Sequence, residues 1–134
     1  THADVADGAS LEIKESILTE FDQFAQTKFC VNLNGSGSRA NVISRSVAKN
    51  KSAQEFISEV NGNNASFGHV ECDAIIVDNA RVLSTPALCN THSDAELSHE
   101  AFIGKIAGEQ LIKLQSLGLT KEEAEAAILS GFLK

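Results

Sequence analysis

The residues best suited to chemistry in this sequence are cysteines, histidines and carboxylates in its second half. Apolar positions alternate from Gly68 to Ile76, which places Cys72 on the apolar face of an expected strand. A free cysteine there is expected to act as a small buried hydrophobe. The opposite face would carry His69, Glu71 and Asp73, whose imidazole and carboxylates suit a divalent metal, although most such strand faces are simply solvated.

Four further residues, Cys30, Cys89, His99 and Glu100, carry side chains that could take part in chemistry. Cys30 falls on the polar side of its strand, and no role is assigned to it. Cys89 follows Pro86 in an expected loop, where an exposed thiol could react, although no cation lies near it in the sequence. His99 and Glu100 are adjacent, so a strand would point them to opposite faces and a turn would let them converge. Taken alone, such a pair is usually two surface polar residues.

Composition limits the classes of function. The 134 residues suffice for one core, and the net charge of −7 argues against a nucleic-acid surface. No segment resembles a signal peptide, and no apolar run approaches the roughly 20 residues that cross a bilayer. Three widely spaced cysteines without a CxxC pair argue against a disulfide framework, so a reducing cytoplasm is expected.

Most of the chain has the period-two pattern of half-buried strands. We expect strands over Ser10–Ile17, Thr27–Leu33, Ala40–Val47, Glu55–Val60 and Ser66–Val77, separated by turns rich in Gly, Asn and Ser. Short strands recurring in this way can form either an antiparallel sandwich or a solenoid of stacked coils. Thin layers of Val, Ile, Leu and Ala suit the solenoid, whereas the absence of a clean internal repeat weighs mildly against a solenoid.

The end of the chain is expected to be helical. Ala107, Leu111 and Leu114 recur at helical spacing, and Gly118 is expected to close that helix. A second helix is expected to begin at a capping box, with Thr120 at the N-cap and Glu123 three residues later, and to end at Gly131. Its buried stripe is expected to be Ala124, Ala127 and Ile128. Two such short helices must pack on something, so they either cap the stack of strands or form a docking surface.

A series of short motifs resembles the SufB/SufD family of iron–sulfur cluster assembly scaffolds. Glu71-Cys72-Asp73-Ala74 is similar to the family's Gln-Cys-Asp-Ser, and Pro86 stands where the family has a proline before its His-Glu-Ala. The order and spacing of the following pairs complete the resemblance, which covers roughly residues 66 to 133: His99-Glu100-Ala101, Lys105-Ile106, Gln110-Leu111, Gly118-Leu119, Glu123-Ala124 and Gly131-Phe132. The His-Glu-Ala motif leans toward SufB, because SufD more often has His-Gly-Ala.

The resemblance implies a fold and a site. The fold would be a right-handed parallel β-helix over residues 1–106 followed by a helical segment over residues 107–134, with a sandwich or jelly roll as the alternative. The nascent iron–sulfur cluster would be held by Cys72, His99 and Glu100. Cys72 and His99 are 27 residues apart, so coils of roughly 20 to 30 residues would place them about one coil apart.

The resemblance also implies partners. An ABC-type ATPase subunit would grip the helical segment, and a second SufB/SufD-like subunit would complete a homodimer or heterodimer. The residues expected to bind the ATPase are Leu111, Leu114, Ala124, Ile128 and Phe132. Family members are longer and this chain lacks an initiating Met, so a C-terminal fragment is expected. An upstream cysteine that the family uses in sulfur handling has no counterpart here.

Some family positions differ, and enzyme motifs are missing. Ile112-Lys113 replaces an aromatic pair of the family, and Leu117 replaces an arginine. The sequence contains no phosphate-binding loop, GxSxG elbow or HExxH motif, so an enzyme is not expected. Three hypotheses remain: a cluster-assembly scaffold, a structural module that binds the ATPase without a cluster, and a metal-dependent small-molecule enzyme using His69, Glu71 and Asp73.

Overall fold

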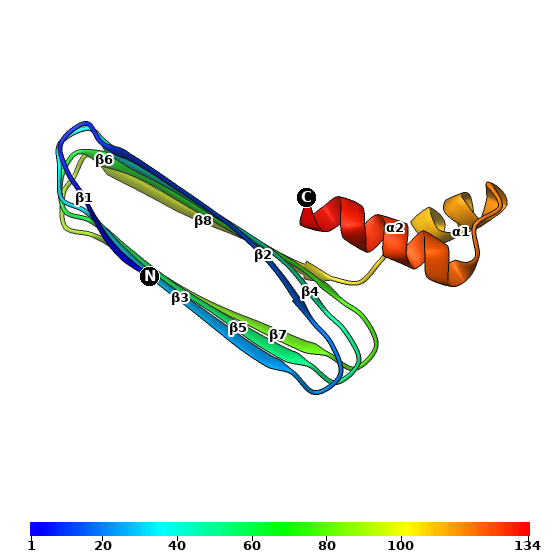
Figure 1. Cartoon of the computed structure of the whole chain (residues 1–134). Coiled ribbons are helices and arrows are strands. Elements are labelled where there is room, and N and C mark those ends of the chain that lie inside the picture. The colour runs from blue at the N-terminus through cyan, green and yellow to red at the C-terminus, as the bar shows by residue number, and fades with distance from the viewer.

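The computed structural model describes residues 1–134 as a parallel β-solenoid followed by two helices. Successive strands alternate between two four-stranded parallel sheets, β1-β3-β5-β7 and β2-β4-β6-β8, so that the chain winds through flattened coils (Figure 1). The predicted solenoid is therefore confirmed, and the alternative sandwich is wrong. The strands are β1 His2–Val5, β2 Ser10–Thr19, β3 Phe24–Leu33, β4 Ser38–Ala48, β5 Ala53–Gly62, β6 Ser66–Ile76, β7 Arg81–Asn90 and β8 Ala95–Gly104.

Side-chain alternation along each strand builds a thin aliphatic core. One coil advances the chain by 28 or 29 residues, as the pairs Ser44↔Cys72 and Cys72↔Ala101 show. Inward residues therefore stack on their equivalents in the next coil. The interior is closely packed at Gly68, where an added Cβ would lie 2.8 Å from a Leu97 methyl group and 3.1 Å from Val60. The core consists mainly of small aliphatic residues such as Val31, Leu33, Val42, Val60 and Val70.

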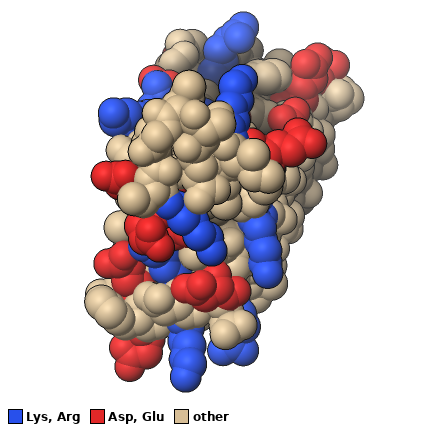
Figure 2. Space-filling model, turned by 90° about the vertical axis from the view of Figure 1, so that its right-hand side faces the viewer, with Lys and Arg blue, Asp and Glu red and all other residues tan.

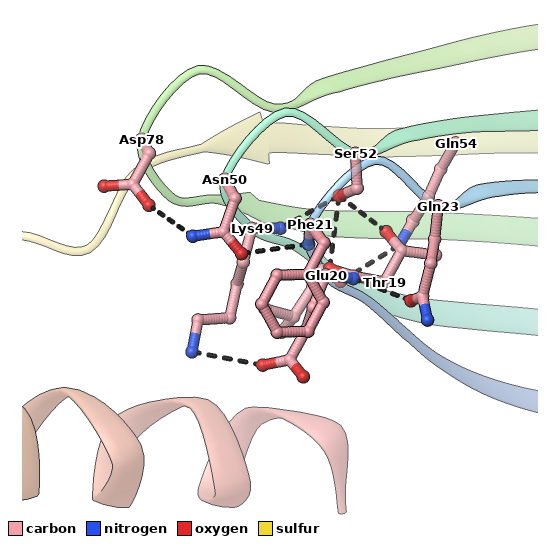
Figure 3. Close-up of polar contacts among 10 residues, drawn as sticks. Thr19, Glu20, Phe21, Gln23, Lys49, Asn50, Ser52, Gln54 and Asp78 are labelled. Atoms are coloured by element: carbon pink, nitrogen blue, oxygen red, sulfur yellow. Dashed lines mark hydrogen bonds and ion pairs between the residues drawn. The ribbon is translucent and has the colours of Figure 1, made fainter.

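Polar side chains hold the corner between the sheets in register (Figure 3). Phe21, Asn50 and Asp78 occupy equivalent corner positions, and all three have left-handed backbone with φ between 57° and 61°. The Asn50 amide oxygen accepts from the Phe21 N–H at 2.9 Å, while its Nδ2 donates to Asp78 at 3.3 Å. Beneath them, buried Gln54 donates to both the Thr19 hydroxyl and the Val47 carbonyl at 2.9 Å. Hydrogen bonds between corner residues of successive coils thus hold the turns of these coils together.

Strand β7 corrects the expectation of a loop around Cys89. Both Pro86 and Cys89 lie inside this strand, which pairs with β5 along its whole length. Proline lacks an N–H donor, but β7 is an edge strand and one of its edges has no partner to which it must donate. The proline therefore does not break the sheet.

The two helices are α1, Gly108–Ser116, and α2, Lys121–Leu133. The predicted capping box is confirmed: Glu123 N–H donates to the Thr120 hydroxyl at 3.2 Å, and Thr120 N–H donates to the Glu123 carboxylate at 2.8 Å. Gly118 closes the first helix as predicted, with φ of +98°. The predicted end at Gly131 is wrong, because α2 continues through it to Leu133. Neither helix has the length and apolar character that spanning a membrane requires.

Helix α2 packs on the outer face of the sheet β2-β4-β6-β8, near the carboxyl ends of its strands (Figure 1). Leu129 contacts the outward-facing Val47 and Ile75 in a small apolar cluster. The Ser16 hydroxyl adds a hydrogen bond of 2.8 Å to the Leu133 carbonyl. The helices therefore lie against the side of the stack and do not cap its end.

The predicted buried stripe of this helix is only partly correct. Ala124 is buried, but Ala127 is exposed and Leu129 takes its place. The sequence period alone could not fix the rotation of α2, because this rotation follows the position of the outer apolar residues on the sheet.

Candidate functional site

The structure brings Cys72 and His99 to the same inward face of two adjacent strands. Cys72 lies on β6 and is in register with Ala101 of β8, while His99 is in register with Val70. Since alternate residues share a face, His99 is a diagonal neighbour of Cys72 one coil further along. Their Cα atoms are separated by about 8 Å, given the usual strand spacing and a two-residue offset.

Cys72 is held as a buried thiol. Only 2% of its surface is exposed. This burial raises the pKa of the thiol, and the carboxylates of Asp73 and Glu15 raise it further, while the Ser84 hydroxyl acts in the opposite direction. Glu15 also points inward, where its carboxylate accepts a hydrogen bond of 2.8 Å from Ser44. A metal that binds this sulfur must therefore displace a proton.

His99 presents an imidazole nitrogen that nothing in the chain satisfies. Its Nε2 atom is buried and has no hydrogen-bond partner. Burial lowers the pKa of the ring, and His69 on the neighbouring strand lowers it further. The neutral imidazole is the form that coordinates metals. A buried nitrogen without a hydrogen-bond partner costs free energy of folding. The site is therefore better suited to a bound metal on this nitrogen than to a purely structural histidine.

Ser84 is a further inward polar residue, which the sequence interpretation missed. It lies on β7 in register with the core residue Phe56, and its buried hydroxyl oxygen also lacks a hydrogen-bond partner. The inward position of Ser84 could have been predicted from the sequence, because alternate residues share one strand face: Val82, Ser84, Pro86 and Leu88. The proline led to the loop interpretation and concealed that pattern.

Glu100 does not join these residues. It belongs to β8, so it points to the outer face opposite to His99, where it is exposed and in register with Glu71. The turn in which His99 and Glu100 could converge does not exist, because the strand runs on to Gly104. The structure therefore brings together two of the three predicted cluster ligands.

The outer face of β6 carries the alternative metal ligands His69, Glu71 and Asp73, and the first two make contacts with surface side chains. The His69 ring is 2.8 Å from the Ser98 hydroxyl, and Glu71 lies 3.9 Å from Arg45. No group of three His, Cys, Asp or Glu side chains is arranged to hold a metal ion. The remaining thiols, Cys30 and Cys89, belong to the other sheet.

The residues predicted to bind a partner on the helical segment contribute mostly to internal packing. Ala124 is fully buried, and Phe132 packs against the cluster that joins α2 to the sheet. Leu111, Leu114 and Ile128 are half-buried. The large apolar residues that this segment exposes are Ile112 and Leu117, at 67% and 73%. Figure 2 shows this side of the molecule, where uncharged atoms form a central area surrounded by basic and acidic side chains.

Comparison with known proteins connects this geometry to one family. Residues 2–132 match the family model described as the SufBD core domain of the SUF system for iron–sulfur cluster assembly. An iron-sulfur cluster assembly SufBD family protein of Pyrococcus horikoshii is 35% identical over 98% of this chain and 40% of its own length. A second SufBD family protein of that organism is 34% identical over 97% of this chain and 30% of its own length.

A SufBD family protein of Methanothermobacter thermautotrophicus strain Delta H is 39% identical over 77% of the chain and 26% of its own length. The chain thus spans at most 40% of the length of these relatives.

Proposed function

The chain belongs to the SufBD family of iron–sulfur cluster assembly proteins, and from this premise we propose that it is a non-enzymatic scaffold that holds a nascent cluster between Cys72 and His99. The supporting observation is the inward position of both residues on adjacent strands, with the Nε2 atom of His99 buried and unpaired. A thiolate and an imidazole are both established ligand types for iron–sulfur clusters. The cluster is cargo, which the protein assembles and passes on.

The two side chains of one chain are too few to complete a cluster, because such clusters commonly have four protein ligands. The last coil leaves room for more. Strands β7 and β8 each have one edge without a partner, and the inward residues Leu88 and Ile103 of this coil remain 41% and 40% exposed. We propose that a second SufB/SufD-like subunit meets this open coil, covers its apolar interior and supplies the missing ligands.

The helical segment is the proposed site for an ABC-type ATPase subunit. Ile112 and Leu117 are exposed, and α1 buries none of its residues. An exposed apolar helix face of this kind can bind in a hydrophobic groove of a partner protein. Nucleotide hydrolysis would then belong to the partner.

Anaerobic reconstitution with ferrous iron and sulfide tests the scaffold function. The protein should develop a sulfide-to-iron absorption band that Cys72→Ala and His99→Ala each reduce strongly. Cys30→Ala removes an equally free thiol from the other sheet and should leave the band unchanged. A band of full intensity in Cys72→Ala would refute the ligand assignment.

A second candidate is an interaction module that holds no cluster. The absence of any three convergent metal-binding side chains in this chain favours it. In that case, reconstitution would give no band with or without a second subunit, while the ATPase would still be captured.

A further inference from the structure

Both strands of the last coil carry a buried polar atom without a hydrogen-bond partner. In the whole chain four buried side-chain polar atoms lack a hydrogen-bond partner: Ser38 Oγ, Ser58 Oγ, Ser84 Oγ and His99 Nε2. The last two belong to β7 and β8, the two strands of the last coil. The proposed function gives His99 a partner, but it leaves the Ser84 hydroxyl without one.

The fold places Ser84 on the inner face of the last coil, beside the core cluster that contains Cys72. Ser84 occupies an inward position of β7, because its register partner Phe56 is a core residue with 5% exposure. Phe56 and Cys72 pack in the same core cluster, so Ser84, one coil beyond Phe56, faces the same part of the interior as Cys72. Its buried hydroxyl has no hydrogen-bond partner there. Ala101, in register with Cys72 on the last coil, offers no polar group.

We propose that Ser84 is a positioning residue of the cluster site and that its hydroxyl donates a hydrogen bond to the Cys72 sulfur when that sulfur holds a metal ion. This inference rests on the proposed function, since it assigns a metal to Cys72. Hydrogen bonds to ligand sulfurs are a recognised means of tuning metal–thiolate centres. The bond would give the buried hydroxyl its missing partner and stabilise the sulfur in its charged form.

The hydrogen bond has a spectroscopic consequence. It lowers the energy of the sulfur lone pairs, so charge transfer from sulfur to a bound metal requires more energy. Loss of the hydroxyl should therefore move the charge-transfer band to longer wavelength. Loss of one such bond to a charged group should also weaken metal binding by about tenfold.

Cobalt(II) titration provides the test, because it reports the metal–thiolate bond without requiring cluster assembly. The experiment uses the full chain with Cys30→Ala and Cys89→Ala, which leaves Cys72 as the only thiol. Ser84→Thr and Ser84→Val form a matched pair of nearly equal shape, of which only threonine keeps the hydroxyl. Ser38→Ala is the control, since Ser38 is a buried serine with an unpaired oxygen at the far end of the same sheet as Cys72.

The proposal predicts that Ser84→Val and Ser84→Ala shift the band to longer wavelength and weaken cobalt binding about tenfold. Ser84→Thr and Ser38→Ala should retain the original band and affinity. Equal bands and affinities in the Thr and Val variants would overturn it, as would the lack of any thiolate–cobalt band before Ser84 is changed. If the bands depend on Ser84 but iron and sulfide form no cluster, the scaffold function fails and the role of Ser84 stands.

Discussion

His99 combines a cost for folding with a proposed use in binding. Its unpaired Nε2 atom lies inside the last coil, where neither protein nor solvent satisfies it. Residues that destabilise the empty protein in this way are typical of functional sites, where stability and activity conflict. The inward position of the ring follows from strand alternation, so neighbouring residues on β8 cannot substitute for it.

The first prediction follows from this conflict. His99→Leu should stabilise the unloaded protein by about 1 kcal/mol, because it removes a buried polar atom without a partner. The same substitution should abolish iron binding at this coil. Urea unfolding of the metal-free protein measures the first effect, with His69→Leu on the outer face as the control. A variant less stable than the wild type would show that the ring is satisfied in solution.

Individual residues also show where sequence interpretation stops. The alternation from Gly68 to Ile76 correctly placed Cys72 inside the coil, because period two fixes the side of the strand on which each residue lies. His99 and Glu100 could not be assigned to faces without knowing that β8 continues through them to Gly104. Ser84 was hidden because Pro86 suggested a loop, whereas an edge strand tolerates proline.

Among the elements, the corners of the coils hold non-glycine residues in the left-handed backbone region. Phe21 holds a left-handed backbone with φ of 57° although its ring is 70% exposed and gains little from packing. The equivalent position in the next coil is Asn50, a residue type that tolerates this conformation.

A second prediction therefore concerns this corner. Phe21→Asn should stabilise the protein by about 0.5–1 kcal/mol, because asparagine accepts the left-handed region at lower cost. Phe24→Asn is the control, since Phe24 is similarly exposed but lies in strand β3. The effects of Phe21→Asn and Phe24→Asn are both measured as changes in the free energy of unfolding. An equal change in the two variants would show that loss of the exposed ring, rather than the backbone, causes the effect.

The capping box of α2 makes stability depend on pH. The backbone N–H of Thr120 and its side chain lower the pKa of Glu123 below its ordinary value of 4.5. A carboxyl with a lowered folded-state pKa stabilises the fold above its unfolded pKa, and this contribution disappears as pH falls through the folded value.

The third prediction follows from this loss of stability at low pH. Glu123→Gln keeps a hydrogen-bonding side chain at the cap but removes the charge, so it should lower the stability of the helix at neutral pH. The difference from wild type should vanish below the folded pKa of Glu123. Unfolding curves at a series of pH values test this, with the exposed Glu122→Gln as the control. A difference that persists in acid would mean that the charge is not its cause.

At the scale of elements, the sequence predicted five of the eight strands, β2 to β6, and the starts of both helices, because local rules determine them. Period two marked the strands, and the Thr120–Glu123 pattern marked the start of α2. The rotation of α2 and its end beyond Gly131 depend on Val47 and Ile75, which belong to distant strands. Contacts between a helix and strands distant in the sequence cannot be predicted from local sequence patterns.

The whole molecule has an open coil at one end and a pair of helices on one side. The exposed interior residues Leu88 and Ile103 mark the proposed subunit contact, and Ile112 and Leu117 mark the proposed ATPase contact. The two surfaces belong to different elements, so they can be tested separately.

The fourth prediction concerns the open coil. Leu88→Lys should weaken association with a SufB/SufD-like subunit by about tenfold or more, because it buries a charge in an apolar contact. Thr85→Lys places the same charge on the outer side of β7 and should have little effect. Sedimentation velocity measures the association. Equal losses in both variants would place the contact elsewhere.

The fifth prediction concerns the helices. Ile112→Glu combined with Leu117→Glu should abolish capture of the ABC-type ATPase subunit while leaving the fold intact, since both side chains are exposed. Gln115→Glu changes charge on the same helix and should preserve capture. Undiminished binding of the double variant would remove α1 from the ATPase interface.

The most direct test of the central claim is electron spin-echo envelope modulation of the reduced, reconstituted cluster in protein labelled with ¹⁵N-histidine. The account predicts a nitrogen coupling from a directly bound imidazole that disappears in His99→Gln and persists in His69→Gln. A reconstituted cluster without histidine coupling, or with coupling that survives the loss of His99, would contradict it.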